Sequence, residues 1–387
     1  MPPDNRIPPQ LTVKRWDIQK FWNHVRVHLV GPLGFFFLLN PSTTATLAQC
    51  TIRASHPAND IFFLEQSDGW IVYTVGTTKY IARTRDRGET WAAFPIHVPL
   101  TKVYFLTPLL GWAVGVNSAG AENSRSYTLS VFVTRDGGEH WSLLPATGFP
   151  GKPPMLVTGV VFVDETYGWL VGEKEFGLSF AYETADGGRT FAEVAALSDR
   201  PQLTRGISSD GTGRIWAYGN DSLVVSTDRG KSWRRELSAG ALAGGYSHLA
   251  FMSAQLLPTG VGLVGAQGAG GVILRTGNAG ESWDVVLKTK DAAYFDSISF
   301  WDDLHGCMAG SSNFLFCTND GGHSWSGLDV LPHYKGSCPS EANLFTNLII
   351  TQSGKGWLRD NGGELYQTND GGKTWHEFDP ARDLHKN

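Results

Sequence analysis

Short apolar runs with strand-like alternation recur along the chain, and a Gly follows each of them and opens a second apolar run. Six residues before this Gly, within the first run, stands Phe63, Phe105, Phe162, Phe300 or Ile350. The second run begins with Gly-Trp at residues 69, 111, 168 and 356, and residues 216–219, 261–265 and 306–310 are degenerate copies. The pattern therefore predicts pairs of short strands that repeat along the chain.

An eight-residue motif closes each repeat. It reads Ser or Thr, any residue, Asp, any residue, Gly, two residues, and then Trp or Phe. Asn278 replaces the Asp in one copy, and Phe191 replaces the Trp in another. The copies occupy residues 84–91, 134–141, 184–191, 226–233, 276–283, 318–325 and 368–375, so that successive copies lie 42 or 50 residues apart. A fixed period of this length is typical of a repeat architecture.

Each repeat is predicted to contain four short strands. The first ends near the Phe, the second is the Gly-Trp run, the third leads into the eight-residue motif, and the fourth follows its aromatic residue. Of the 14 Trp residues, six end a motif and five lie in the second strand, where they suit packing between repeats. We therefore predict an all-β fold, a seven-bladed β-propeller with four-stranded antiparallel blades. The repeats run from about residue 58 to 379.

The third position of the motif is predicted to build a turn. An Asp there can accept bonds from backbone N–H groups that follow it, and the Gly tolerates a positive φ. A calcium loop needs several oxygen ligands within about a dozen residues, whereas each copy supplies one carboxylate. We therefore assign a structural role to Asp86, Asp136, Asp186, Asp228, Asn278, Asp320 and Asp370, and expect no metal site and no cofactor.

Residues 1–49 resemble a targeting segment that precedes a single propeller domain at 50–387. The basic residues Lys14, Arg15, Lys20 and Arg26 precede an apolar run at 29–39, and residues 46–48 form a plausible signal-peptidase site. Cys50 follows Leu47-Ala48-Gln49, which is similar to a lipoprotein box except that Gln49 stands where a small residue is expected. Lipidation of Cys50 and cleavage after Ala48 are therefore alternatives. Both predict export, with a periplasmic or lumenal protein that is at most peripherally attached to the membrane.

The charge balance disfavours nucleic acid as a partner. The whole chain carries a net charge of −5, and removal of residues 1–48 leaves 27 basic and 35 acidic residues, a net charge of −8. An acidic chain without a Lys/Arg run is a poor nucleic-acid binder. The pair Cys307 and Cys317 lies symmetrically about a short turn, so an exported chain could form a disulfide there, with two free thiols as the alternative.

Few residues of the repeats are candidates for binding or catalysis. Inner strands bring one residue from each blade together at the axis of a propeller, and these strands offer Lys102, Arg205, His248 and Asp296 as a candidate binding face. A glycosidase would need a pair of carboxylates beside aromatic residues. Residues 116–127, 146–154 and 173–177 form long loops or extended hairpins, where a rigid scaffold can place binding contacts.

The repeat resembles a known family. Asp boxes, also called bacterial neuraminidase repeats, occur in sialidases, xyloglucan-cleaving enzymes, sortilin-type receptors and photosystem II stability and assembly factors. The combination of a Phe-ending strand, Gly-Trp-Ala-Val-Gly and Thr-Arg-Asp-Gly-Gly-Glu-His-Trp looks most similar to the last family. That resemblance implies a non-enzymatic, exported scaffold that binds membrane-protein partners such as photosystem II. We expect the chain to be a monomer. The alternative is an exported glycoside hydrolase that acts on extracellular glycans.

Overall fold

The computed structural model describes residues 56–384, apart from 65–66, 120–125, 150–153, 176–177, 199–204, 212, 221, 239, 241, 243–247, 269, 290–293, 312–313 and 330–344. Contacts divide the chain into Met1–Ala48 and Gln49–Asn387, and the described residues all belong to the second unit. Cys50, the cleavage region and Cys338 lie outside the described residues. No described helix has the length and apolar character that crossing a bilayer would require.

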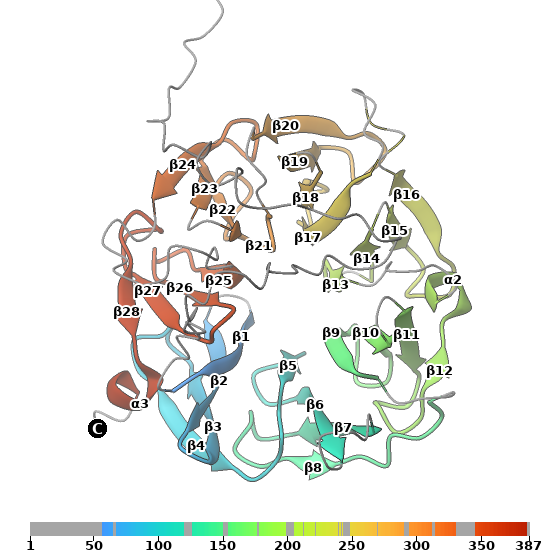
Figure 1. Ribbon diagram of the computed structural model, residues 1–387, viewed down its shortest axis with the longest axis vertical. Helices are drawn as coiled ribbons and strands as arrows, with labels where there is room; N and C mark the ends of the chain where they lie inside the picture. The colour runs from blue at the N-terminus through green and yellow to red at the C-terminus, as the bar shows by residue number, and fades with distance from the viewer. Residues whose placement is uncertain are drawn as a thin grey trace, which may run out of the picture. The chain divides into compact units, whose positions relative to one another are not determined.

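Seven four-stranded antiparallel sheets surround a common axis, as Figure 1 shows. Blade 1 contains β1 (Ala58–Leu64), β2 (Asp68–Val75), β3 (Thr78–Thr84) and β4 (Ala92–Ile96). Blade 2 contains β5 (Lys102–Phe105), β6 (Gly111–Ala119), β7 (Ser126–Thr134) and β8 (Ser142–Leu143). Blade 3 contains β9 (Leu156–Phe162), β10 (Gly168–Glu175), β11 (Leu178–Thr184) and β12 (Ala192–Glu193), followed by the short helix α2 (Ala195–Ser198).

The remaining blades follow the same order. Blade 4 contains β13 (Gly206–Ser209), β14 (Ile215–Gly219), β15 (Ser222–Ser226) and β16 (Arg234–Ser238). Blade 5 contains β17 (Ala250–Leu256), β18 (Gly262–Gln267), β19 (Gly271–Thr276) and β20 (Asp284–Lys288). Blade 6 contains β21 (Ser297–Phe300), β22 (Gly306–Ala309), β23 (Phe314–Thr318) and β24 (Ser326–Asp329). Blade 7 contains β25 (Phe345–Ile350), β26 (Gly356–Asp360), β27 (Leu365–Thr368) and β28 (His376–Phe378), before the helix α3 (Pro380–Asp383).

The predicted seven-bladed propeller with four antiparallel strands in each blade is confirmed. The first strand of each blade is the innermost one, and each contacts the first strand of the next blade, with β25 contacting β1. Blades 1 and 7 each supply all four of their own strands, so packing between complete blades closes the ring. At this junction Ala58 N donates to Gly363 O at 2.9 Å, Arg359 Nε donates to Ala58 O at 2.6 Å, and Leu384 after α3 packs into the cluster that the two blades share.

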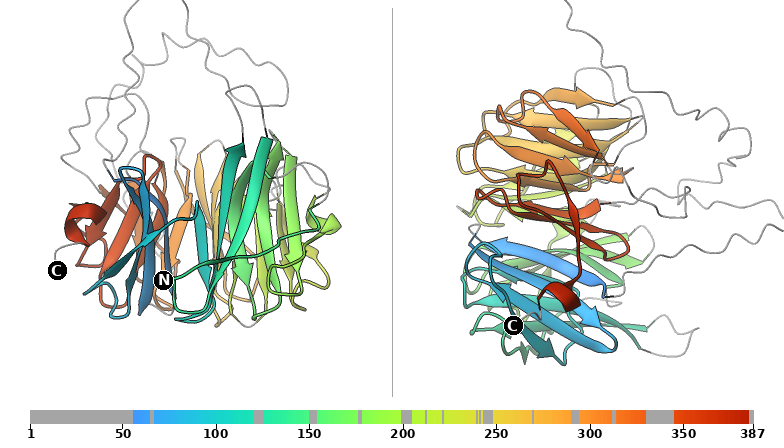
Figure 2. Two further views of the ribbon diagram at one scale, coloured as in Figure 1. Left: turned by 90° about the horizontal axis from the view of Figure 1, so that it is seen from below. Right: turned by 90° about the vertical axis from the view of Figure 1, so that its left-hand side faces the viewer.

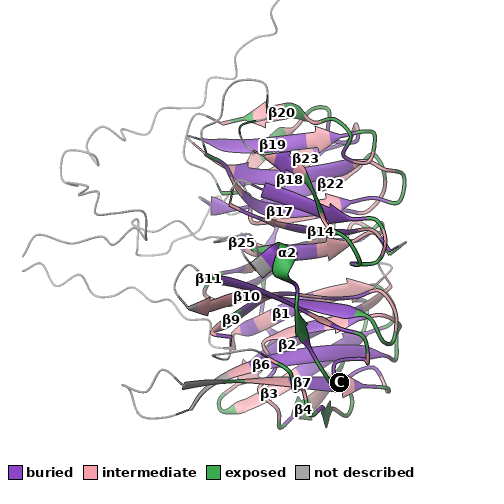
Figure 3. Ribbon diagram, turned by 90° about the vertical axis from the view of Figure 1, so that its right-hand side faces the viewer, coloured by how far each residue is buried: buried purple, intermediate pink, exposed green. Residues whose placement is uncertain are grey.

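Stacked aromatic rings join neighbouring blades. Trp70 on β2 lies against Phe105 at the end of β5, with ring centroids 3.6 Å apart and planes 6° apart. Trp112 and Phe162 repeat this stack between blades 2 and 3, at 3.7 Å and 4°. The Phe ring also covers the Gly that opens the second strand, because a Cβ at Gly111 would lie 2.5 Å from Phe105. The six-residue spacing in the sequence is therefore explained by the packing of the Phe ring on this Gly. The contact lies in the core between blades, where Figure 3 shows buried strands.

The Asp boxes form the turns between the third and fourth strands. In the first box, Thr84 Oγ1 donates to Asp86 Oδ1 at 2.7 Å, Gly88 N donates to Thr84 Oγ1 at 2.8 Å, and Thr90 N donates to Asp86 Oδ1 at 2.9 Å. The same three bonds recur in the six other boxes. Bonds from the Ser232 hydroxyl and amide lower the pKa of Asp228 to about 2. The carboxylates thus accept bonds from their own turns.

Each box also docks on the preceding blade. Trp70 Nε1 donates to Gly137 O in the box of blade 2 at 2.8 Å, and Trp112 Nε1 donates to Gly187 O in the box of blade 3 at 3.0 Å. At the ring closure, a Cβ on Gly88 would lie 2.1 Å from the Trp357 ring of blade 7. The boxes are therefore connections between blades as well as turns within them.

Blade 6 contains a disulfide. Cys307 on β22 and Cys317 on β23 are opposite each other in the register of the two strands. Their sulfurs are bonded, and their Cα atoms lie 4.1 Å apart. Of the two alternatives that the sequence left open, the structure has the bonded pair. It ties the second and third strands of this blade together across the hairpin.

Candidate functional site

All inner strands begin at the same face of the propeller, which we call the entry face. Each inner strand runs from this face to the opposite one, where it turns into the second strand. The third strand runs in the same direction as the first, so the box turns also lie on the opposite face, which we call the box face. The bond from Gly137 N in a box to Leu109 O in the turn between β5 and β6 joins two turns of the box face.

A hollow of about 460 Å³ lies at the entry face, where blades 7, 1, 2 and 3 meet. We call it the entry hollow. Its lining combines two cations, two amides, two hydroxyls and an apolar side. The lining residues are Asn59, Thr101, Lys102, Val116, Met155, Leu156, Val157, Thr346, Asn347 and Arg359. Leu156 is 50% exposed, so the apolar side is open to a partner.

The Asp60 carboxylate accepts hydrogen bonds from neighbouring blades at the base of this hollow. It accepts a bond from Lys102 Nζ at 3.2 Å and from Val103 N at 3.0 Å, and Asn347 Nδ2 approaches at 3.5 Å. The Asp60 side chain is 5% exposed whereas that of Lys102 is 30% exposed. The buried Asp60 carboxylate therefore connects blades 7, 1 and 2 beneath the floor of the hollow. The Lys102 ammonium group remains accessible from the hollow.

Arg359 supplies the second cation. Its Nε donates to Ala58 O at 2.6 Å, and its Nη1 donates to Thr346 Oγ1 at 2.7 Å. Burial lowers the pKa of Arg359, and the nearby Asp60 and Asp360 carboxylates act in the opposite direction. An Arg stays protonated through such a change. The entry hollow thus offers two positive charges, and no Asp or Glu is among the described residues that line it.

The four candidate face residues separate into different parts of the entry face. Lys102 is in the entry hollow, with Asp60 as its partner. Arg205 precedes blade 4 and its charge acts on Asp296, which precedes blade 6, whereas His248 precedes blade 5. The prediction that Arg205, His248 and Asp296 lie on inner strands is wrong, because they precede β13, β17 and β21. An inner strand begins at the first residue that pairs with the second strand of its blade. In blade 4 this first residue is Gly206, which lies opposite Tyr218 near the end of β14.

Sequence reasoning missed Arg359 and Asn59 as lining residues. Arg359 lies on a second strand that is otherwise largely buried, and its position near the axis depends on closure between the first and last blades. A charged residue within the Gly-Trp run was the one signal that could have found it. In the described part of the chain, no group of three or more His, Cys, Asp or Glu residues could hold a metal ion.

Asp296 gives the entry face a pH-dependent contribution to stability. Burial raises the pKa of Asp296 from its ordinary 3.8 to about 6, and Arg205 opposes the shift. An acid with a raised pKa in the folded state binds a proton that the unfolded state has lost, so its contribution to stability falls as pH rises from about 4 to about 6. We expect Asp296→Asn to gain stability relative to the wild type over this range, in urea unfolding at pH 4 and pH 7. The exposed Asp284→Asn is the control, and a gap that does not change with pH would contradict the account.

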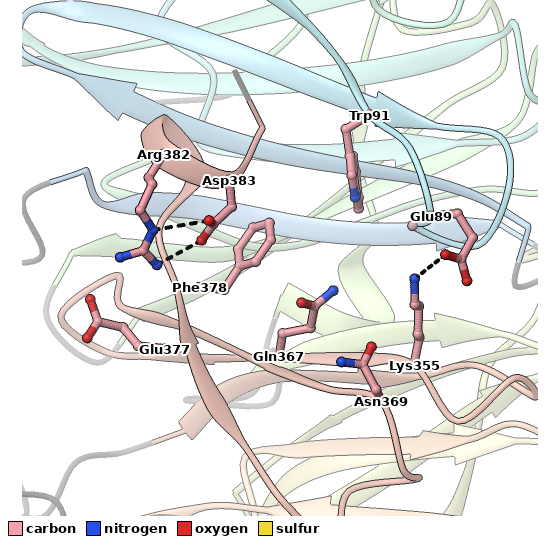
Figure 4. Close-up of a pocket in the computed structure, with 10 residues that line it drawn as sticks. Glu89, Trp91, Lys355, Gln367, Asn369, Glu377, Phe378, Arg382 and Asp383 are labelled. Carbon is pink, nitrogen blue, oxygen red and sulfur yellow. Dashed lines mark hydrogen bonds and ion pairs between the residues drawn. The ribbon is translucent and has the colours of Figure 1, made fainter. Parts of the chain in front are cut away.

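A second hollow, of about 550 Å³, lies where blades 7 and 1 meet beside α3 (Figure 4). Lys355 Nζ there contacts Glu89 Oε2 at 2.7 Å, and Arg382 Nη2 contacts Asp383 Oδ2 at 2.8 Å. Lys355 is thus paired with Glu89 across the junction of blades 7 and 1, and Arg382 is paired with Asp383 within α3. The entry hollow, with an accessible ammonium group and an open apolar side, is the better candidate for binding.

Comparison with known proteins agrees with this description. Residues 262–379 match the family described as photosynthesis system II assembly factor YCF48. The chain is 31% identical over 279 residues to the photosystem II assembly lipoprotein Ycf48 of Synechococcus sp. (strain CC9902), and the match covers 69% of this chain and 73% of that protein.

Solved structures of the same family share the fold. The structure described as YCF48 bound to D1 peptide matches with a TM-score of 0.55 and 18% identity, over 82% of this chain and 94% of that chain. YCF48 from Cyanidioschyzon merolae matches with a TM-score of 0.54 and 18% identity, over 82% and 96%. The predicted resemblance is confirmed, and the chain belongs to the Ycf48 family of photosystem II assembly factors.

Proposed function

We propose that this chain is an exported, non-enzymatic assembly scaffold that binds a polypeptide segment of a membrane-protein partner at its entry face. The observation that carries the proposal is the entry hollow, where Lys102 and Arg359 lie beside an open apolar side formed with Met155 and Leu156. Such a surface suits a peptide that combines apolar and acidic side chains. Family membership supports a photosystem II subunit as the partner, and the structure of one relative is described as bound to a D1 peptide.

Export and attachment are further parts of the proposal. The basic and apolar pattern of residues 1–49 supports export, and the Synechococcus relative is called a lipoprotein. We propose a location on the periplasmic or lumenal side of the membrane, with attachment through Cys50 as one route and cleavage after Ala48 as the other. The propeller then acts as a monomer that is at most peripheral to the membrane.

The glycoside hydrolase remains the alternative, but the described residues of the entry hollow do not favour it. A glycosidase needs two carboxylates that flank the scissile bond. The hollow is lined instead by cations, amides, hydroxyls and aliphatic groups. Turnover of model glycosides that one carboxylate substitution abolished would support the alternative.

Binding to peptides tests the proposed function. Fluorescent peptides that tile the exported segments of D1 are titrated with the propeller, and we expect at least one acidic peptide to bind more tightly than its scrambled version. Lys102→Glu should weaken binding by about tenfold or more, because a close opposite charge becomes a repulsive one. Lys231→Glu, an exposed reversal on the box face, is the matched control. Absence of binding throughout the series, or equal effects of the two reversals, would contradict the proposal.

A further inference from the structure

Blade 6 has a cysteine at the place where most blades have a buried Trp. The Trp of each such blade is on the second strand, opposite the residue that precedes the Asp box, and these residues are Trp70, Trp112, Trp169, Trp216 and Trp357. In blade 6, Cys307 occupies that position, and Cys317 is opposite it, directly before the box at Thr318. The Cys307–Cys317 disulfide thus replaces an aromatic side chain in the core between blades.

The disulfide lies against blade 7. Cys307 is fully buried, and it belongs with Cys317 to a cluster that contains Leu348 and Ile350 of β25 and Leu358 of β26. Strands β21 and β22 both contact β25, and Figure 2 shows blades 6 and 7, in orange and red, side by side. The disulfide therefore fills the part of the junction that a Trp ring fills in other blades.

Hydrogen bonds extend this junction to the inner strands. Ser299 on β21 is opposite Cys307, and its Oγ accepts a bond from Ile350 N at 3.0 Å. Ser297 Oγ accepts a bond from Leu348 N at 2.8 Å in the same way. The strand that pairs with the disulfide-bonded β22 therefore holds β25 directly.

Strands β25 and β26 also carry part of the entry hollow. Asn347 precedes Leu348 on β25, Arg359 follows Leu358 on β26, and both Asn347 and Arg359 line the hollow. The two lining residues are opposite each other in the register, and so are the two leucines. Successive side chains of a strand point to opposite faces. The packing of the disulfide on the leucines therefore helps to fix where Asn347 and Arg359 lie.

We propose that the Cys307–Cys317 pair is a redox site whose bonded state keeps the entry hollow in its binding form. The reductant is a protein with a redox-active dithiol. Cys317 is partly exposed whereas Cys307 is buried, so the reductant reaches the sulfur of Cys317 first. The inference rests on the proposed function and specifies how binding at the same site is regulated.

The exchange consumes a dithiol and returns a disulfide. One thiolate of the reductant attacks the Cys317 sulfur, the S–S bond breaks, and Cys307 leaves as a thiolate that takes up a proton. The second thiolate of the reductant attacks its own sulfur in the mixed disulfide and releases Cys317, which is protonated in turn. Two electrons and two protons pass to the propeller. Blade 6 then lacks both the bond and the Trp of the other blades, so β25 is held less firmly.

Thiol labelling of the folded protein tests the exchange. Cys50→Ser and Cys338→Ser remove the two other cysteines of the chain, and all measurements use this background. We expect dithiothreitol to make two thiols reactive toward a polyethylene glycol maleimide without denaturant, while the far-UV circular dichroism stays unchanged. A pair that resists reduction in the folded protein, or that is reduced only with global unfolding, would overturn the inference, because the bond would then be a permanent structural link.

Peptide binding tests the regulation. With the tightest-binding acidic D1 peptide, we expect reduction to weaken binding by about fivefold or more, and reoxidation to restore it. The double variant Cys307→Ala with Cys317→Ala is the control, since it should bind like the reduced protein and should not respond to dithiothreitol. Equal affinities of the oxidised and reduced forms would overturn the inference and leave the proposed function intact.

Amide hydrogen exchange gives a readout that needs no peptide. On reduction, exchange should become faster at Leu348 and Ile350, whose N–H groups are bonded to β21, and should stay unchanged in the strands of blade 2. If no peptide binds to either form, the proposed function fails, whereas faster exchange at these two amides would still support a redox-dependent junction. Unchanged exchange at both amides would overturn that junction.

Discussion

Replacing Trp70 with Ala is expected to lower the free energy of unfolding by about 3–5 kcal/mol. The Trp70 side chain is fully buried, stacks on Phe105 of the next blade and donates to Gly137 O. Its removal leaves a cavity between blades 1 and 2 and an acceptor without its donor in the box of blade 2. Urea or guanidinium unfolding, followed by circular dichroism, measures the change.

Two controls separate the contributions of Trp70. Trp70→Phe keeps an aromatic ring against Phe105 but loses the indole N–H, so its cost should be smaller, with about 1 kcal/mol for the hydrogen bond itself. Leu143→Ala removes a side chain that is 65% exposed and should change the stability by less than about 0.5 kcal/mol. Equal stabilities of Trp70→Ala and Leu143→Ala would show that the stack does not hold the blades together.

Asp60→Ala is expected to lower the free energy of unfolding by about 3 kcal/mol. The change removes the acceptor of the buried Val103 N–H and the partner of Lys102, and it breaks the connection of blades 1 and 2 at the base of the entry hollow. Asp60→Asn keeps an acceptor of similar size and should cost clearly less. Thermal and urea unfolding of the two variants make the comparison, and equal losses would contradict the bridging role.

The sequence predicted the repeat well because its determinants are local. The hydroxyl of Thr84, the carboxylate of Asp86 and the amide of Gly88 meet within one turn, so an eight-residue pattern contains the whole interaction. The spacing from Phe105 to Gly111 also has a short-range cause, since the ring covers the Gly on the adjacent strand. Fold class and blade number follow from repetition of these local contacts.

The entry hollow depends on contacts that local patterns do not contain. Arg359 reaches Ala58 across 301 residues of sequence, and only closure of the ring brings them together. The sequence places residues 116–127 in a long loop or an extended hairpin, and the structure shows that 116–119 and 126–127 lengthen β6 and β7, because the hairpin continues its pairing as far as Ala119 opposite Ser126.

Site-specific photo-crosslinking tests the central claim, that the partner binds at the entry face, most directly. A benzophenone amino acid is placed at Leu156, which lines the entry hollow, or at Leu304, which lies in the turn between β21 and β22 on the box face. The two positions are 50% and 54% exposed, so their accessibility is matched. With the native membrane, the account predicts a crosslink to a photosystem II subunit from position 156 and none from position 304. A crosslink from position 304 alone would contradict it.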